Sequence, residues 1–325
     1  MHQLLRSIGR NALQAVPTIL AVIVLSFFLL RLAPGDAADY AAAESGAATA
    51  ESVADIRQAY GLDLPVHTQL WNYVSRLAHL DLGYSVRYGQ SVTELIGERL
   101  PSTLVLMAVS IFCALGFGIA IGVCMSHFAG RLPDRLGSLV TQLFYSIPAF
   151  WVGTMLIVLF SVKLGWFPSG GSKSIGVDES GVAWLADRAK YVVLPAMSLT
   201  LYYLGIYARL TRNAMAEAID RDHVKTAIAK GVKPWQVIRR HVLRNALLPI
   251  TTVAGMHIAG ILGGAVVIET VFNWPGMGRL AYEAVMAREP QTLMGIMLVC
   301  SLMVIVSNAV VDLIHAILDP RVKVR

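Results

Sequence analysis

The chain has 325 residues, of which 56% are hydrophobic and only 15% are charged, with a formal net charge of +6. This composition excludes an ordinary soluble domain and is typical of a protein that crosses a membrane several times. The three cysteines, Cys113, Cys124 and Cys300, all lie in apolar runs. Their spacing fits neither a metal site nor a disulfide framework.

Six stretches of the chain contain no Asp, Glu, Lys or Arg. They cover residues 11–30, 100–130, 136–162, 191–208, 245–268 and 290–311. A helix needs about 20 residues to cross a bilayer, whereas barrel strands would alternate over about ten residues. The sequence therefore predicts an all-α polytopic membrane protein. Its six transmembrane helices are expected at about 11–32, 101–127, 137–162, 191–211, 247–270 and 291–317.

The first apolar stretch has some features of a cleaved signal peptide. Arg6 and Arg10 precede it, and the small residues Ala37 and Ala38 follow it. Its 20 residues exceed the apolar region of a signal peptide, about 7–15 residues, so we expect an uncleaved span.

The distribution of Lys and Arg predicts the orientation of the spans. With a cytoplasmic N-terminus, the inner segments hold 16 of the 27 basic residues, nine of them between Arg209 and Arg244. Inner loops of membrane proteins carry such an excess, so both termini are expected in the cytoplasm. This asymmetry explains the net positive charge, and no nucleic-acid partner is expected.

Residues 33–99 are expected to form an outer loop, since the segment from Arg31 to Arg99 has nine acidic and five basic residues. Helical spacing of apolar residues predicts an amphipathic helix on the outer surface. Its apolar residues are Leu70, Tyr73, Val74, Leu77 and Leu80. Two roles are open for this face, packing against the ends of the spans and contact with a transported molecule.

Two prolines mark features of the second and third spans. Pro101 suits the first turn of a helix, so the second span is expected to begin there. Pro148 lies inside the third span, where proline removes a backbone hydrogen bond and kinks a helix. In a bilayer such a bend is tolerated where protein or water satisfies the freed carbonyl group. The bend at Pro148 is thus either functional or merely tolerated.

The segment 213–249 is expected to be a cytoplasmic loop between the fourth and fifth spans. The fourth span should continue as helix from Thr211 to about Asp220, and Pro249 should mark the point where the chain re-enters the membrane. The loop between these points contains the most informative pattern of the sequence.

This loop is expected to fold as a helix–glycine–helix hairpin. Asp222 or Thr226 starts the first helix, and Gly231 suits the left-handed residue that ends it. Pro234 suits the first turn of the second helix. The remaining residues are basic (Lys225, Lys230, Lys233, Arg239, Arg240), small (Ala227, Ala229) or apolar (Trp235, Val237, Ile238). Such a hairpin either sits in a groove of a partner protein or binds lipid headgroups.

The hairpin resembles the EAA loop of permease subunits in bacterial ABC importers. That loop has an acidic residue and two alanines, an invariant glycine and a leucine–proline pair. Here Lys225-Thr226-Ala227 occupies the first three positions and Gly231 the glycine. Lys225 replaces the acidic residue, and Leu243-Arg244 stands at the leucine–proline position, with the proline displaced to Pro249. Both departures resemble the dipeptide/oligopeptide permease branch, which includes nickel and glutathione importers.

Other stretches resemble the same branch, in order, over nearly the whole chain. They are Arg31–Asp36, Asp81–Ser85, Glu98–Thr103, Ser146–Trp151, Glu269–Gly278 and Leu318–Arg321. The resemblance implies a permease fold of six transmembrane helices, a homologous second permease, two ATPase subunits and an extracytoplasmic solute-binding protein. It also implies that the ATPases contact the coupling helix within Asp222–Gly231. The expected contact residues are Asp222, His223, Lys225, Thr226, Ala227, Lys230 and Gly231.

The chain contains no GxxxxGK[ST] phosphate loop. The nearest glycine-rich stretch, Gly170-Gly171-Ser172-Lys173, lacks its spacing and context. We therefore expect no cofactor and no enzymatic activity in this chain, with ATP and Mg²⁺ bound by the ATPase subunits.

Three residues in the spans are candidates for the pathway or a gate: Pro148, His257 and Glu269. His257, among glycines near the middle of the fifth span, either bonds to a neighbouring helix or lines the path. Glu269, at the outer end of that span, either forms part of an outer gate or lies at the membrane interface. No cluster of His, Cys or carboxylate residues has the spacing of a metal or catalytic site.

The sequence thus predicts a permease subunit in the bacterial inner membrane that forms half of the pore of an ATP-driven importer for di- or oligopeptides. Nickel complexes and glutathione are alternative cargoes, and selectivity is expected to reside in the binding protein. An ion-coupled carrier would need intramembrane carboxylates or broken helices that coordinate ions, and the charge-free runs offer little of either. An intramembrane enzyme would need a nucleophile–base pair or metal ligands, which the spans do not provide.

Overall fold

A computed structural model describes residues 16–28, 32, 49–59, 61, 63–85, 87–176 and 181–318. Several sequence features therefore lie outside the described residues. These are the basic residues Arg6 and Arg10, most of Arg31–Asp36, the pair Ala37-Ala38, and the chain after Leu318. The chain divides into two compact units, Met1–Thr103 with Pro275–Val306 and Leu104–Trp274 with Ser307–Arg325.

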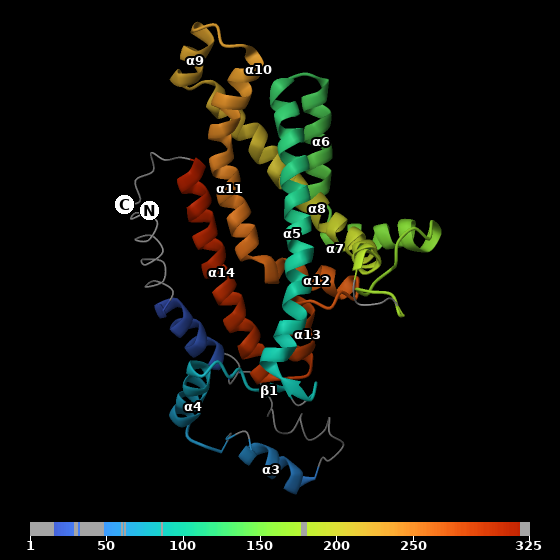
Figure 1. The fold of residues 1–325 in the computed structure, drawn as a ribbon, viewed down its shortest axis with the longest axis vertical. Helices are drawn as coiled ribbons and strands as arrows, with labels where there is room; N and C mark the ends of the chain where they lie inside the picture. Colours follow the sequence, from blue (N-terminus) through green and yellow to red (C-terminus); the bar gives the residue numbers. More distant parts are fainter. Residues whose placement is uncertain are drawn as a thin grey trace. The chain divides into compact units, whose positions relative to one another are not determined.

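Helices make up nearly all of the regular structure (Figure 1). An apolar helix at Val16–Phe28 comes first. The other elements are α3 Ala50–Ala59, α4 Val66–Ala78, β1 Tyr84–Ser85, β2 Gln90–Ser91, α5 Val92–His127, α6 Leu132–Ser146, α7 Ala149–Leu156, η1 Ile157–Lys163, α8 Gly181–Ile219, α9 Asp222–Ala229, α10 Pro234–Val237, η2 Ile238–Val242, α11 Leu243–Ala259, α12 Ile261–Val271, α13 Met277–Met286 and α14 Pro290–Leu318. The two short strands pair antiparallel, and η1 and η2 are π-helical.

Four of the six predicted spans coincide with long apolar segments. The helices α5, α8 and α14 are each long and apolar enough to cross a membrane, and α6 with Ala149–Lys163 forms a fourth span if this bent pair counts as one. The predicted span 11–32 overlaps the shorter helix Val16–Phe28. The predicted span 247–270 is divided between α11 and α12, which meet at Gly260. The helical, multi-span fold agrees with the prediction, and a count of six is compatible with it.

Pro101 does not lie in the first turn of its helix as predicted, because α5 starts at Val92. The backbone N–H of Glu94 donates to Ser91 Oγ at 3.2 Å, while the Ser91 N–H and hydroxyl donate to Glu94 Oε2 at 3.3 and 2.9 Å. This reciprocal arrangement is a capping box, which satisfies free backbone donors at a helix start. It fixes the start of α5 and leaves Pro101 inside the helix.

The third predicted span contains a corner at Pro148. α6 ends at Ser146, and Ile147 is extended with ψ 130°, so Pro148 stands just ahead of α7. The two helical pieces are bent by 95°. Proline disfavours helical backbone in the residue before it, which explains why Ile147 leaves the helix. Ser198 Oγ donates to the Ala149 carbonyl at 2.6 Å and so attaches the new helix to α8.

The helix α8 contacts α6, α7 and α11 and is central to the second unit. Two glycines on α5 pack against it. A Cβ atom at Gly118 would lie 2.7 Å from Tyr207 Cβ, and one at Gly122 would lie 2.5 Å from the Ala208 carbonyl oxygen. Small residues permit such close approach between membrane helices. These two positions therefore have no room for a larger side chain.

The predicted amphipathic helix is α4, in the first unit. Its apolar face joins a cluster of Ile23, Phe27, Leu70, Tyr73, Val74, Leu77 and Met294. Packing is therefore the observed role of this face. Leu80 does not belong to it, because it lies beyond the helix end, has φ +59° and is 84% exposed. The predicted helix was therefore too long, because α4 ends at Ala78.

Candidate functional site

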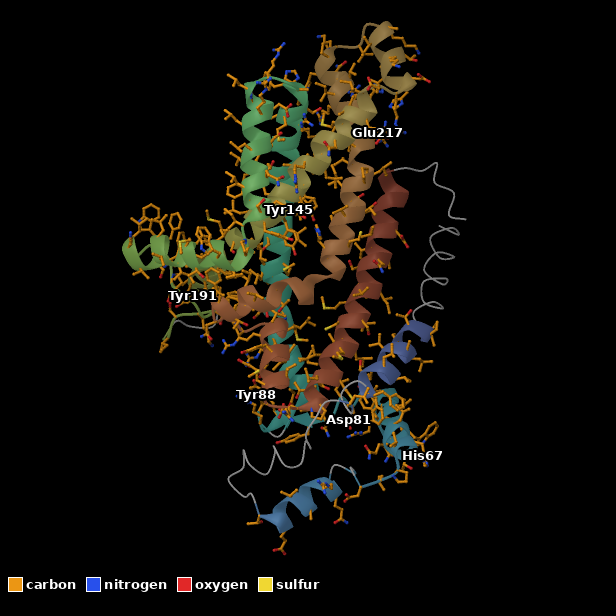
Figure 2. The ribbon with its side chains drawn as sticks, turned by 180° about the vertical axis from the view of Figure 1, so that it is seen from behind. His67, Asp81, Tyr88, Tyr145, Tyr191 and Glu217 are labelled. Carbon is orange, nitrogen blue, oxygen red and sulfur yellow. The ribbon has the colours of Figure 1, made fainter. Side chains whose placement is uncertain are left out.

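The predicted cytoplasmic hairpin is a direct extension of α8. This helix continues without interruption from Gly181 to Ile219, beyond the predicted end of the fourth span. The short helices α9 and α10 follow. Figure 1 shows both at one end of α8 and α11, and Figure 2 labels Glu217 at that end of α8. A single rigid helix thus connects the hairpin with the predicted span.

Gly231 ends α9 in the left-handed conformation that the sequence predicted, with φ +74°. The Gly231 N–H donates to the Ile228 carbonyl at 2.9 Å, and the Val232 N–H donates to the Ala227 carbonyl at 3.2 Å. These two bonds form a Schellman motif, which satisfies the last carbonyl groups of a helix. Pro234 then opens α10 at its first turn, as predicted.

The hairpin has a small hydrophobic core of its own. Its buried members are Met215, Ala218, Val224, Ala227, Val237, Val242 and Ala246. Ala227 is only 5% exposed, so its side chain faces this core, and the expected contact of Ala227 with a partner protein stays a prediction. Its small size serves the approach of α9 to α8 and η2. Val237, one of the apolar residues of the predicted hairpin, is likewise buried.

The opposite face of the hairpin is exposed. It consists of Asp222, His223, Lys225, Thr226, Ile228, Ala229 and Lys230 on α9, with Trp235 on α10. Ile228 is 57% exposed and Trp235 is 64% exposed. Large apolar side chains surrounded by charges are typical of protein contact surfaces, where aromatic residues often contribute most of the binding energy. We call these eight residues the α9 face.

His223 links the α9 face to the start of α11. The amide nitrogen of Asn245 lies 2.8 Å from His223 Nε2 and also donates to the His241 carbonyl at 2.9 Å. Since the amide nitrogen is a donor, Nε2 is the acceptor in this contact. The first turn of α9 is therefore attached to the helix that follows the hairpin.

An ion pair attaches α6 to α8 beside the hairpin. Arg212 Nε and Nη2 donate to Asp134 Oδ1 and Oδ2 at 2.5 and 2.8 Å, and the Gly130 N–H donates to Oδ2 at 2.8 Å. Asp134 lies ahead of the predicted span 137–162 and is 3% exposed. The hydrogen bonds from Arg212 and Gly130 lower the pKa of Asp134 from 3.8 to about 2. The carboxylate is thus ionised at neutral pH.

The three candidate pathway residues occupy different environments. His257 Nδ1 lies 3.0 Å from the Tyr207 hydroxyl, and the Tyr203 ring is 4.8 Å away between centroids. This supports the interpretation of a histidine bonded to a neighbouring helix. Glu269 is fully buried, so it is not exposed to headgroups. Pro148 is exposed at the corner before α7. A role in the pathway stays a prediction for all three.

The described residues contain neither a candidate metal site nor a phosphate-binding glycine loop. No group of three or more His, Cys, Asp or Glu among them could hold a metal ion. The Gly170–Lys173 stretch packs against the end of α12, where the Gly171 N–H donates to the Phe272 carbonyl at 2.9 Å. A Cβ at Gly170 would lie 2.5 Å from that same oxygen. The glycines therefore serve close packing.

Two elements of the site were missed by the sequence analysis. Asn245 carries no local signal, since its role depends on a contact with His223 across the hairpin. The Asp134–Arg212 pair had a partial signal. Each residue lies just outside the expected end of an apolar run, and opposite charges at neighbouring span ends are candidates for pairing.

Comparison with known proteins adds to these observations. Residues 114–324 match the family described as binding-protein-dependent transport system inner membrane component. Residues 4–107 match the N-terminal part of binding-protein-dependent transport system membrane components.

Individual relatives cover almost the whole chain. A peptide transport system permease protein of Brucella abortus is 38% identical over 97% of this chain and 98% of its own length. The glutathione transport system permease protein GsiC of Salmonella typhimurium is 36% identical over 98% of this chain and 99% of its own length.

Solved structures share the fold. An inward-facing form of the MetNI methionine ABC transporter has a TM-score of 0.55 at 20% identity, covering 70% of this chain and 97% of that one. An amino acid ABC transporter crystallised with histidines has a TM-score of 0.51 at 16% identity, covering 69% and 94%.

Proposed function

The chain belongs to the family of binding-protein-dependent transport system inner membrane components and is a permease subunit of an ABC importer, and on this premise we propose that it conducts di- or oligopeptides and is driven through its α9 face. The family is one of multi-pass inner-membrane subunits that work with ATPases and another membrane subunit. In our proposal this chain forms half of the pore with a homologous permease. Both of its termini lie in the cytoplasm, and an extracytoplasmic binding protein delivers the cargo.

The observation that carries the proposal is the division of the hairpin into a buried and an exposed side. A loop needed only for membrane orientation would not need its own core, a Schellman motif and two outward apolar side chains. A rigid element with an exposed apolar and charged face is suited to a groove in a partner. The two ATPase subunits, which bind ATP and Mg²⁺ in this proposal, provide that groove.

The contacts of the hairpin provide a mechanism for coupling. Closure of the ATPases on ATP moves the α9 face as a rigid body. The core residues transmit this motion to α8, and the His223–Asn245 contact transmits it to α11. Packed helices have discrete alternative arrangements, so a small displacement at one end can select between an outward-open and an inward-open state.

Peptides are the favoured cargo because of the chain's relatives. Those 38% and 36% identical are named for peptide and glutathione transport. Glutathione is itself a short peptide, and it is the second candidate. Nickel complexes are a third. The binding protein is expected to choose among them.

Reconstitution tests the proposal. The chain, its second permease and the two ATPases are placed in vesicles with the cognate binding protein, and uptake of labelled dipeptide, oligopeptide, glutathione and Ni²⁺ is measured. We expect peptide uptake that requires ATP and the ATPases. Uptake that persists without the ATPases, driven by an ion gradient, would show an ion-coupled carrier instead. ATP-dependent uptake of Ni²⁺ or glutathione alone would correct the cargo.

A further inference from the structure

A basic pocket lies just after the hairpin and is separate from the α9 face. It has a volume of about 800 Å³ and is lined by Arg239, Arg240, His241, Leu243, Arg244 and Leu247. These residues belong to η2 and to the first turns of α11. The three arginines are exposed, and the two leucines are half-buried.

The winding of η2 brings the arginines together. In an α-helix, residues five apart point in directions about 140° from each other. The i→i+5 pattern of a π-helix turns them toward one side. η2 covers Ile238–Val242, so its winding turns Arg239 toward the side that carries Arg244. Short π segments inside α-helical runs occur frequently at functional sites.

The positive charge of the pocket is not neutralised within the part of the chain that the structure describes. Among the described residues, no carboxylate forms an ion pair with Arg239, Arg240 or Arg244, whereas Arg212, Arg221 and Arg279 each have one. Guanidinium groups bind phosphate oxygens through two parallel hydrogen bonds. The pocket therefore favours a ligand with a phosphate group.

The leucines indicate the kind of phosphate ligand. Leu247 lies where the fifth span is predicted to begin, and Leu243 lies one helical turn before it, so two apolar side chains line the pocket together with the arginines. A site that combines arginines with apolar side chains next to a predicted span matches a phospholipid, which has an anionic headgroup and acyl chains. Basic clusters on the cytoplasmic side of a span attract anionic lipids. An acidic loop of a soluble partner would match the arginines but not the leucines.

We propose that this pocket binds the headgroup of an anionic phospholipid from the inner leaflet, with Arg239, Arg240 and Arg244 on the phosphate and Leu243 and Leu247 against the acyl chains. The bound lipid fixes the start of α11 at the membrane surface. The position of the hairpin relative to the bilayer then depends on lipid composition, whatever the cargo.

The test uses the assembled transporter. Wild type, Arg240→Gln/Arg244→Gln and the charge-retaining Arg240→Lys/Arg244→Lys are purified and exposed to phosphatidylglycerol or phosphatidylcholine, and bound lipid is counted by native mass spectrometry. A matched control, Arg131→Gln/Arg135→Gln, removes two exposed inner arginines outside the pocket. We expect wild type to retain phosphatidylglycerol preferentially. Loss of both arginines in the glutamine variant should weaken retention about 25-fold, from about fivefold for each arginine, while the control is unchanged.

Several results would overturn the proposal. Equal retention of both lipids by wild type, or equal loss in the pocket and control variants, would show that no specific site exists. Displacement of the lipid by inorganic phosphate at low concentration would identify a free-anion site. Loss of the ATPase subunits from the glutamine variant, with normal thermal stability of the permease, would assign the pocket to the ATPase contact. The expected result is a retention by the lysine variant between those of wild type and the glutamine variant, because lysine keeps the charge but cannot form the two parallel hydrogen bonds of arginine.

Discussion

Replacement of Gly231 by valine tests whether the turn after α9 is required for coupling. Gly231 has φ +74°, and a Cβ atom there would meet nothing within 4 Å. The cost of a larger residue is therefore conformational and not steric. Left-handed backbone costs a residue with a Cβ atom about 1–2 kcal/mol, and a β-branched residue is a more severe outlier there.

If the valine variant leaves the left-handed region, it loses the two hydrogen bonds of the Schellman motif instead. Each such bond contributes about 0.5–1.5 kcal/mol. By either route the native hairpin is disfavoured by about 1–3 kcal/mol, which is roughly a five- to 150-fold change in its population relative to alternatives.

The matched control is Gly231→Asn, because asparagine tolerates left-handed backbone far better than valine. Co-purification of the ATPases and ATP-dependent uptake are measured for both variants at equal membrane expression. We expect the valine variant to lose most of both and the asparagine variant to keep most of both. Equal activity of the two variants, whether high or low, would refute the importance of the left-handed turn.

Three further substitutions test the surroundings of the hairpin. Ala227→Trp overfills the hairpin core, so the free energy of unfolding should fall by about 1–3 kcal/mol and retention of the ATPases should fall with it. A loss of ATPase retention without a loss of stability would mean that Ala227 contacts the partner directly. Asp134→Asn removes the charge that Arg212 binds and should lower stability at neutral pH by about 1–3 kcal/mol. Since the pKa of Asp134 is lowered from 3.8 to about 2, its contribution is present above pH 3.8 and is lost toward pH 2, so wild type and variant should converge only at that acid end; convergence near neutral pH would contradict the ion pair. Lys225→Glu should reduce ATPase retention, whereas Lys163→Glu, which reverses another exposed lysine at the end of η1, should not; equal effects would point to net charge alone.

The hairpin was predictable because its signals are local. Gly231 and Pro234 act on the backbone of one or two residues, and both have the conformations expected from their chemistry. Charge-free runs likewise predicted the long helices, since the cost of burying a charge in a membrane acts on each segment by itself.

Positions whose structure depends on tertiary contacts or on competing local signals were less predictable. Ala227 was expected to face a partner, but it lies three residues after Val224, on the side of α9 that packs in the hairpin core. Pro101 was given priority over the Ser91–Glu94 capping box, although the box was visible in the sequence. The 95° corner before α7 exceeds an ordinary proline kink, because Ile147 leaves the helical region altogether.

Photo-cross-linking from the α9 face tests the proposed role of the hairpin most directly. A photoreactive amino acid is introduced at Ile228, which is 57% exposed on α9, and separately at Leu159, which is 47% exposed on η1. In the active, reconstituted transporter we expect Ile228 to give a cross-link to an ATPase subunit and Leu159 to give none. The absence of any ATPase cross-link from Ile228, in a transporter that still imports its cargo with ATP, would contradict the proposal that the hairpin is the ATPase contact.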